Sequence, residues 1–174
     1  RLAGKSLAEY LKKNQEKPPE TAPGMVEQFQ AKYERPLGRA KGKDLYGIRD
    51  VLRDMNWDKV GVARNEKKLS EALQEIKNLR DAADDVGVQG ARAYNMVWND
   101  FISFLSMLDV SMLVATSALY RTESRGAHFR LDCPEQDDVN GLYNIFLQQG
   151  EDGEPVLETR HVDLKYLKPS DLIE

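Results

Sequence analysis

Apolar side chains recur at helical spacing along most of this chain, and polar breaks divide them into elements. Residues 1–14 and 25–33 each place apolar side chains on one helical face. Residues 17–24, KPPETAPG, form a connector, because prolines remove backbone donors and fix φ. The pattern therefore predicts a helix, a linker and a short helix within residues 1–43.

Two longer amphipathic helices follow, at residues 44–57 and 66–85, with Asp44 and Asn65 as their N-terminal caps. The side chains expected to face the core are Leu45, Ile48, Val51, Leu52 and Met55, then Leu69, Leu73, Ile76, Leu79 and Ala83. The residues expected to fill the corner between the two helices are Trp57, Val60 and Val62.

A third helix is predicted over residues 91–125, where apolar positions alternate steps of four and three. Its expected seam is Tyr94, Trp98, Phe101, Leu105, Leu108, Met112, Ala115 and Leu119. Gly126 is the expected C-terminal cap, because glycine tolerates positive φ. Polar residues interrupt the apolar segment 96–120, which favours a buried helix over a membrane span.

Residues 142–149 and 156–166 are strand-like, and GEDG between them predicts a β-hairpin. The expected fold is mainly α: an antiparallel three-helix bundle, similar to a spectrin repeat, over residues 44–130. An extended tail with the hairpin occupies residues 131–174. A bundle of three helices, in which the two shorter helices cover the long apolar one, is the simplest arrangement.

Composition narrows the possible functions. The 174 residues carry a net charge of −4, which argues against a nucleic-acid binder, since such proteins need a basic face. The lone cysteine, Cys133, fits a reducing compartment and is interpreted as a packed side chain rather than a reactive thiol. Metal binding is not expected: Glu158 and His161 match one E-x-x-H spelling, but only once and in a predicted strand.

A charged cluster, RTESRGAHFRLD, occupies residues 121–132. A local interpretation is that Arg121 and Arg125 offset the negative end of the long helix, with Glu123 neutralising them. Alternatively, the arginines grip carboxylates on another domain or subunit, a role that suits the bidentate guanidinium. The residue pattern leaves both interpretations open.

The same stretch resembles the ESRGAHxRxDxPxxDD segment of succinate dehydrogenase and fumarate reductase flavoprotein subunits. The matching residues are Glu123, Ser124, Arg125, Gly126, Ala127, His128, Arg130, Asp132, Pro134, Asp137 and Asp138. RLAG at residues 1–4 resembles the end of the GRxAG helix that closes the family's FAD-binding domain. Trp57, Val60, Gly61 and Arg64 resemble its W-x-x-VG-x-x-R corner. Residues 104–108 depart from the family's E-L-x-N-L stretch.

The resemblance implies that FAD binds in the full-length protein, in a Rossmann-like domain that precedes this piece, and not in the piece itself. No catalytic, cofactor-binding or metal residue of the family maps onto these positions. The implied role is to scaffold the flavin and capping domains and to dock an iron–sulfur subunit. The interface or structural motif is expected at Glu123, Ser124, Arg125, Gly126, His128, Arg130 and Asp132.

The full-length protein would then be an oxidoreductase of succinate and fumarate, and the isolated piece inactive. Its expected location is the cytoplasm, at the inner face of the membrane, which the complex reaches through an anchor subunit. Two alternatives remain. One is the C-terminal domain of an L-aspartate oxidase, which carries a similar segment and normally works without an iron–sulfur partner. The other is a stand-alone, non-enzymatic helical adaptor.

Overall fold

The computed structural model describes residues 2–14, 20–39, 41–150 and 154–166. The chain divides into two compact units, Arg1–Glu34 and Arg35–Glu174. The first contains α1 (Leu2–Lys13) and α2 (Met25–Glu34), as the periodicity predicted. Residues 15–19 of the expected connector and residues 151–153 of the expected hairpin turn lie outside the described residues. The finer division at residues 43 and 130 stays a prediction.

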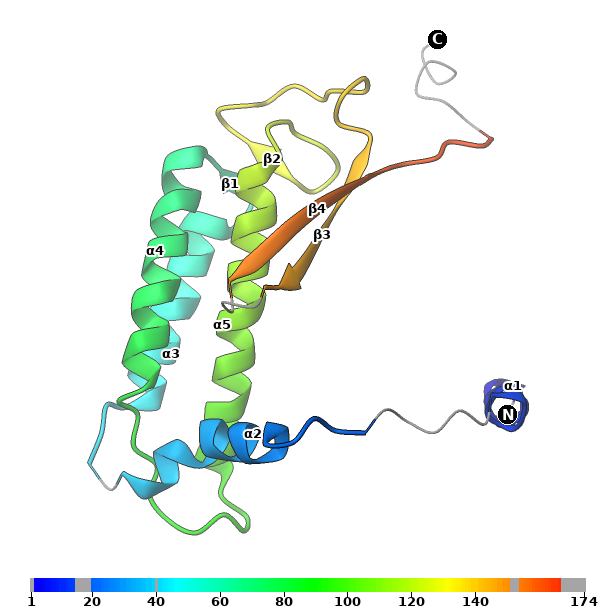
Figure 1. Cartoon of the computed structure of the whole chain (residues 1–174). Helices are drawn as coiled ribbons and strands as arrows, with labels where there is room; N and C mark the ends of the chain where they lie inside the picture. Colours follow the sequence, from blue (N-terminus) through cyan, green and yellow to red (C-terminus); the bar gives the residue numbers. More distant parts are fainter. Residues whose placement is uncertain (1, 15–19, 40, 151–153, 167–174) are drawn as a thin grey trace. The chain divides into compact units, whose positions relative to one another are not determined.

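The second unit is built on α3 (Leu45–Met55), α4 (Glu66–Ala83) and α5 (Met96–Tyr120). These helices lie side by side, and consecutive ones run in opposite directions (Figure 1). The mainly helical prediction is therefore confirmed, whereas the narrower likeness to a spectrin repeat stays a prediction. Core side chains from the three helices are Leu45, Leu52, Met55, Leu69, Ala72, Ile76, Ala83, Phe101, Phe104, Leu105, Leu108, Met112, Ala115 and Ala118.

Each of these helices begins with a side-chain cap. Asp44, Asn65 and Asn95 each accept a hydrogen bond from the backbone N–H three residues further on, at 2.8, 2.8 and 3.0 Å. The caps at Asp44 and Asn65 were predicted. The cap at Asn95 was missed, although an asparagine just before an apolar run is the same signal.

The third helix is shorter at both ends than its apolar pattern predicted. Tyr94 was expected on the seam, but it precedes α5, is fully exposed and has a φ of 56°. At the other end, Arg121 has an extended ψ of 111°, so the helix does not continue to Gly126. Gly126 has a φ of 58° and lies in the turn beyond, so its role as the helix cap was wrong.

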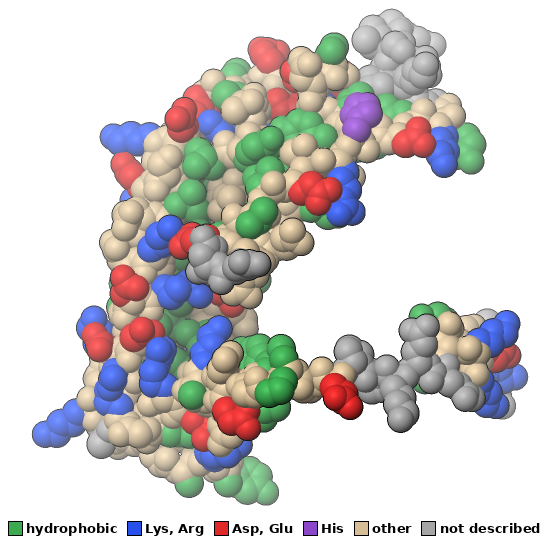
Figure 2. All heavy atoms as spheres, in the orientation of Figure 1, with side chains coloured by type: hydrophobic (Ala, Val, Ile, Leu, Met, Phe, Trp, Pro, Cys, Tyr) green, Lys and Arg blue, Asp and Glu red, His purple; other side chains and the backbone are tan. Residues whose placement is uncertain are grey.

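By length and composition alone, α5 could cross a membrane, a test that core helices of soluble proteins also pass. Its buried side chains pack against α3 and α4. This packing favours a core helix. On the face of the molecule in view, basic and acidic side chains are interspersed rather than gathered in one basic area (Figure 2).

The corner between α3 and α4 differs from the prediction. There α3 passes into a π-helix, η2 (Asn56–Val60). Val60 is buried, but Trp57 is 84% exposed, and Val62, two residues after η2, is 78% exposed. The wider π-turn changes the angular phase of the side chains that follow α3, so the 3.6-residue spacing no longer predicts which of them face inward. Val51, also expected inside, is 54% exposed on α3.

Two small sheets complete the second unit. The predicted hairpin is confirmed: β3 (Tyr143–Gln149) pairs antiparallel with β4 (Pro155–His161), and β3 packs against α5. A second pair was not predicted, in which β1 (Ala63–Arg64) runs parallel to β2 (Phe129–Arg130). It lies where α4 begins and α5 ends (Figure 1).

The opposite end of the helices is closed by the segment before α3. This segment contains a 3₁₀ helix, η1 (Arg35–Gly38). The N–H of Val88 donates to the carbonyl of Pro36 at 2.9 Å, and the N–H of Lys43 donates to the carbonyl of Asp85 at 2.9 Å. The segment therefore crosses the loop that follows α4.

Candidate functional site

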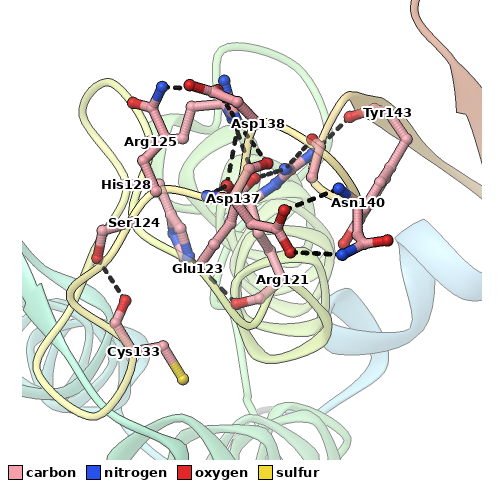
Figure 3. A network of polar contacts seen from close by, with 12 residues as sticks. Arg121, Glu123, Ser124, Arg125, His128, Cys133, Asp137, Asp138, Asn140 and Tyr143 are labelled. Atoms are coloured by element: carbon pink, nitrogen blue, oxygen red, sulfur yellow. Dashed lines mark hydrogen bonds and ion pairs between the residues drawn. The ribbon is translucent and has the colours of Figure 1, made fainter.

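The predicted motif residues all lie in the loop that leaves α5 and returns to β3. Glu123, Ser124 and Arg130 are buried, Arg125 and His128 are half-buried, and Gly126 and Asp132 are exposed. Figure 3 shows Glu123, Ser124, Arg125 and His128 of the motif together with residues that they contact. The structure thus brings the motif together, with Gly126 contributing the turn rather than a contact.

Glu123 is the centre of the network and is only 3% exposed. Its carboxylate accepts hydrogen bonds from Arg121, from Arg125 Nε and Nη2 at 3.0 Å each, and from the N–H of Asp137 at 2.7 Å. Burial alone would raise the pKa of Glu123, but these hydrogen bonds together outweigh it and lower the pKa. Glu123 is therefore a fully paired anion.

The two arginines also hold the chain that follows. Arg121 donates to the carbonyls of Gly141 at 2.9 Å and Tyr143 at 2.5 Å, and its guanidinium lies over the Tyr143 ring. Arg125 donates to the carbonyl of Asp137 and to the carboxylate of Asp138, at 2.8 and 2.9 Å (Figure 3). These contacts fix where β3 begins.

Arg130 is 1% exposed and closes the C-terminal end of α5. Its Nη1 donates to the carbonyls of Ala118, Leu119 and Arg121, at 3.1, 3.1 and 3.2 Å. A helix end leaves such carbonyls without intrahelical partners, and it favours a cation. Arg130 therefore caps the C-terminal end of α5, the role that was expected of Gly126. This explains why α5 ends at Tyr120.

Asp132 joins this helix end to the start of α4. Both of its oxygens accept hydrogen bonds from Arg130, at 2.7 Å each, and one also accepts the N–H of Glu66 at 2.8 Å. Glu66 is the first residue of α4, where the helix dipole favours an anion. The pKa of Asp132 is strongly lowered, chiefly by Arg130.

His128 connects the motif to β1. Its Nδ1 lies 2.8 Å from Nη1 of Arg64, and its Nε2 lies 3.4 Å from the carbonyl of Arg121. A guanidinium can only donate, so Nδ1 accepts and the hydrogen bonds assign a neutral ring with its proton on Nε2. Burial lowers the pKa of His128, as do the nearby cations Arg64, Arg130 and Arg121.

Ser124 links the start of the loop to its later residues by hydrogen bonds. Its Oγ accepts the N–H of Arg130 at 2.9 Å and donates to the carbonyl of Cys133 at 2.8 Å. The expected motif did not include six residues of the network, namely Arg64, Arg121, Asp137, Asp138, Gly141 and Tyr143. Arg64 could have been found, because it belongs to the corner motif. Gly141 and Tyr143 carry no signal beyond the start of a strand.

The network leaves little scope for chemistry of its own, because its carboxylates and imidazole are committed to partners inside the chain. Among the described residues, no group of three His, Cys, Asp or Glu side chains could hold a metal ion. An open hollow of about 500 Å³ lies beside the motif, lined by Asn65, Glu66, Lys67, Ser70 and Asp132.

The starts of α3, α4 and α5 also do not fit a dinucleotide cofactor such as FAD. Such a cofactor needs free backbone N–H groups at a helix N-terminus for its pyrophosphate. The N-termini of α3, α4 and α5 are occupied by Asp44, Asn65 and Asn95, and that of α4 also by Asp132. No step of a flavin reaction is therefore assigned to these residues.

The comparisons with known proteins place this chain beside one group of redox enzymes. The family model described as fumarate reductase flavoprotein C-term matches residues 49–172. A fumarate reductase flavoprotein subunit of Helicobacter pylori is 33% identical over 131 residues, 74% of this chain and 18% of the relative. One of Mycobacterium tuberculosis is 30% identical over 160 residues, 87% of this chain and 27% of the relative.

Solved structures agree with these matches. Mycobacterium smegmatis Sdh1 in complex with UQ1 superposes with a TM-score of 0.80 at 28% identity, covering 95% of this chain and 29% of that chain. A quinol-fumarate reductase with menaquinol molecules gives a TM-score of 0.80 at 26% identity, covering 90% and 28%. This chain thus spans less than a third of the length of each of these relatives.

Proposed function

Because the chain belongs to the family of succinate dehydrogenase and fumarate reductase flavoprotein C-terminal domains, we propose that it serves an FAD-dependent enzyme that interconverts succinate and fumarate. The observation that carries the proposal is the family match over residues 49–172, which contains the whole charged motif. FAD and the dicarboxylate bind in the rest of the longer polypeptide.

Within that enzyme, this domain is a scaffold. The three helices provide a packed core, and the Glu123 and Arg130 contacts hold the end of α5, the start of α4 and the start of β3 in one arrangement. A rigid support of this kind suits the flavin and capping domains, and it suits docking of an iron–sulfur subunit that receives electrons from the flavin. The complex lies on the cytoplasmic side of the membrane and reaches it through an anchor subunit.

The isolated domain performs no catalysis. This part of the proposal is supported by the pairing of Glu123, Asp132 and His128 inside the chain, because a general acid or base must be able to reach a substrate. It is also supported by the side-chain caps at the N-termini of α3, α4 and α5, which leave no cradle for a pyrophosphate at these three helix ends.

The test compares the full-length polypeptide with this chain expressed alone. We expect the full-length protein to show flavin absorption, to oxidise succinate with an artificial electron acceptor and to reduce fumarate. We expect the isolated chain to be colourless and inactive. A full-length protein without flavin or without either activity would contradict the proposal. Oxidation of L-aspartate in place of succinate would favour the oxidase alternative.

A further inference from the structure

The paired strands β1 and β2 place charged side chains inside and apolar side chains outside. Arg130 is 1% exposed, whereas its neighbours Phe129 and Leu131 are 41% and 57% exposed. Arg64 is half-buried, and Val62 is 78% exposed. Soluble proteins almost never bury an arginine completely unless it is paired, so a strand with this polarity needs a specific reason.

The strand register fixes which side chains share the outer side. Ala63 is paired with Phe129 and Arg64 with Arg130, and the N–H of Leu131 donates to the carbonyl of Arg64 at 2.8 Å. Side chains alternate along a strand, so Ala63, Phe129 and Leu131 project to one side and the two arginines to the other.

Two further exposed apolar residues belong to the same corner. Val62 directly precedes β1 and lies outside the strand pairing, so the alternation does not place its side chain, which is 78% exposed. Trp57 lies one turn earlier, with its carbonyl against Gly61. We call Trp57, Val62, Ala63, Phe129 and Leu131 the end surface. It contains a tryptophan that is 84% exposed.

The exposure of the end surface is built into the fold. Arg130 is held by three helix carbonyls and by Asp132, and Arg64 is held by His128 and by the carbonyls of Val60 and Gly61. A one-residue slip would turn the apolar side chains inward only by leaving both arginines without partners. Ala63, Phe129 and Leu131 therefore stay on the outside.

We propose that the end surface is the permanent docking face for the rest of the longer polypeptide, an inference that rests on the proposed function. Permanent interfaces resemble a core cut in two, whereas interfaces of transient partners are about as polar as ordinary surface. An exposed tryptophan among aliphatic side chains is typical of the buried centre of an interface. In Sdh1 a domain of this fold occupies 29% of one continuous chain, so the larger remainder of such a chain is the occupant that is always present.

The experiment introduces one cysteine per variant into the full-length polypeptide and measures its maleimide labelling on the peptide that carries the substitution, which separates it from native cysteines such as Cys133. Val62→Cys and Ala63→Cys report on the end surface, and Asp81→Cys, on the exposed side of α4, is the control. We expect Val62→Cys and Ala63→Cys to be labelled at least about tenfold more slowly than Asp81→Cys, because a covered thiol reacts only after local opening.

Labelling of Val62→Cys and Ala63→Cys as fast as the control would overturn the docking face. Protection that depends on protein concentration would assign the surface to a second copy, and protection that needs an added subunit would assign it to a separate partner; either result overturns the proposal. Fast labelling in an active flavoprotein would refute the docking face and leave the proposed function standing. Slow labelling in a full-length protein that lacks flavin would refute the proposed function and leave the docking face standing.

Discussion

The α-carbon of Gly141 lies directly against the carboxylate of Glu123. A β-carbon at position 141 would overlap that carboxylate and would come within 2.5 Å of the carbonyl oxygen of Asp137. The loop before β3 can therefore close over a buried anion only with glycine at this position. The charged motif depends on a residue that lies outside it in the sequence.

Substituting Gly141→Ala is expected to destabilise the protein by about 2 kcal/mol or more, because either Glu123 or the backbone of residues 137–141 must move. Urea unfolding measures the change. Gly38→Ala is the matched control: its β-carbon would meet nothing within 4 Å, and a change within about 0.5 kcal/mol is expected. Equal effects at the two positions would show that Gly141 does not support the network.

Arg130→Ala is expected to cost about 3–5 kcal/mol, because three carbonyls at the end of α5 and both oxygens of Asp132 lose the donor that Arg130 supplies. Arg130→Lys should recover part of this, since one ammonium group cannot reproduce the planar fork. Arg160→Ala removes an exposed arginine paired with Glu158 on β4 and is expected to change stability by less than about 1 kcal/mol. Thermal or urea unfolding of the three variants ranks them. A small loss of stability in Arg130→Ala would contradict the role of Arg130 as the cap of α5.

Stability is expected to fall as the pH drops below about 6.5, the usual pKa of an unfolded histidine. The folded pKa of His128 is lowered, so the unfolded state takes up the proton first, and the contribution of His128 is lost as the pH falls from about 6.5 towards the folded value. His128→Asn keeps an acceptor for Arg64 but does not titrate, so it should flatten this part of the profile. His161→Asn, at an exposed position on β4, is the control. Identical profiles for wild type and His128→Asn would refute the assignment.

The sequence predicted those features that depend on local residue chemistry. The caps at Asp44 and Asn65 and the hairpin were right, because each follows from the hydrogen-bonding groups of a few neighbouring residues. The inward placement of Trp57 and Val62 was wrong, because it assumed that one helical period continues through a corner that contains a π-turn. Helical spacing cannot detect such a change of phase.

The sequence indicated which residues belong to the motif but not which groups they contact. The motif named charged residues that the structure brings into contact, yet the choice between internal pairing and an outer interface depends on where each guanidinium points. Arg130 reaches back to carbonyls that lie 9 to 12 residues earlier in the sequence. Nothing in the spacing of RTESRGAHFRLD indicates that reach, so the helix was extended to Gly126 in error.

A last prediction concerns the far end of the helices, where two glycines cross. A β-carbon on Gly42 would come within 2.5 Å of the carbonyl oxygen of Asp85 and would overlap the N–H of Gly87. One on Gly87 would come within 2.6 Å of the carbonyl oxygen of Arg39. Gly42→Ala and Gly87→Ala should therefore each cost about 2 kcal/mol or more, because backbone atoms cannot move aside as a flexible side chain can.

Both substitutions force apart the same two backbone segments, so their effects should not add. Once Gly42→Ala has separated the segments, Gly87→Ala meets less resistance, and the double variant should lose less stability than the sum by about 0.5–3 kcal/mol. A double-mutant cycle followed by urea unfolding measures this difference. Pairing Gly42→Ala with Gly141→Ala, which acts in the charged loop, supplies an additive control. Full additivity at Gly42 and Gly87 would mean that each glycine is required for a separate reason and that the crossing is not a single unit.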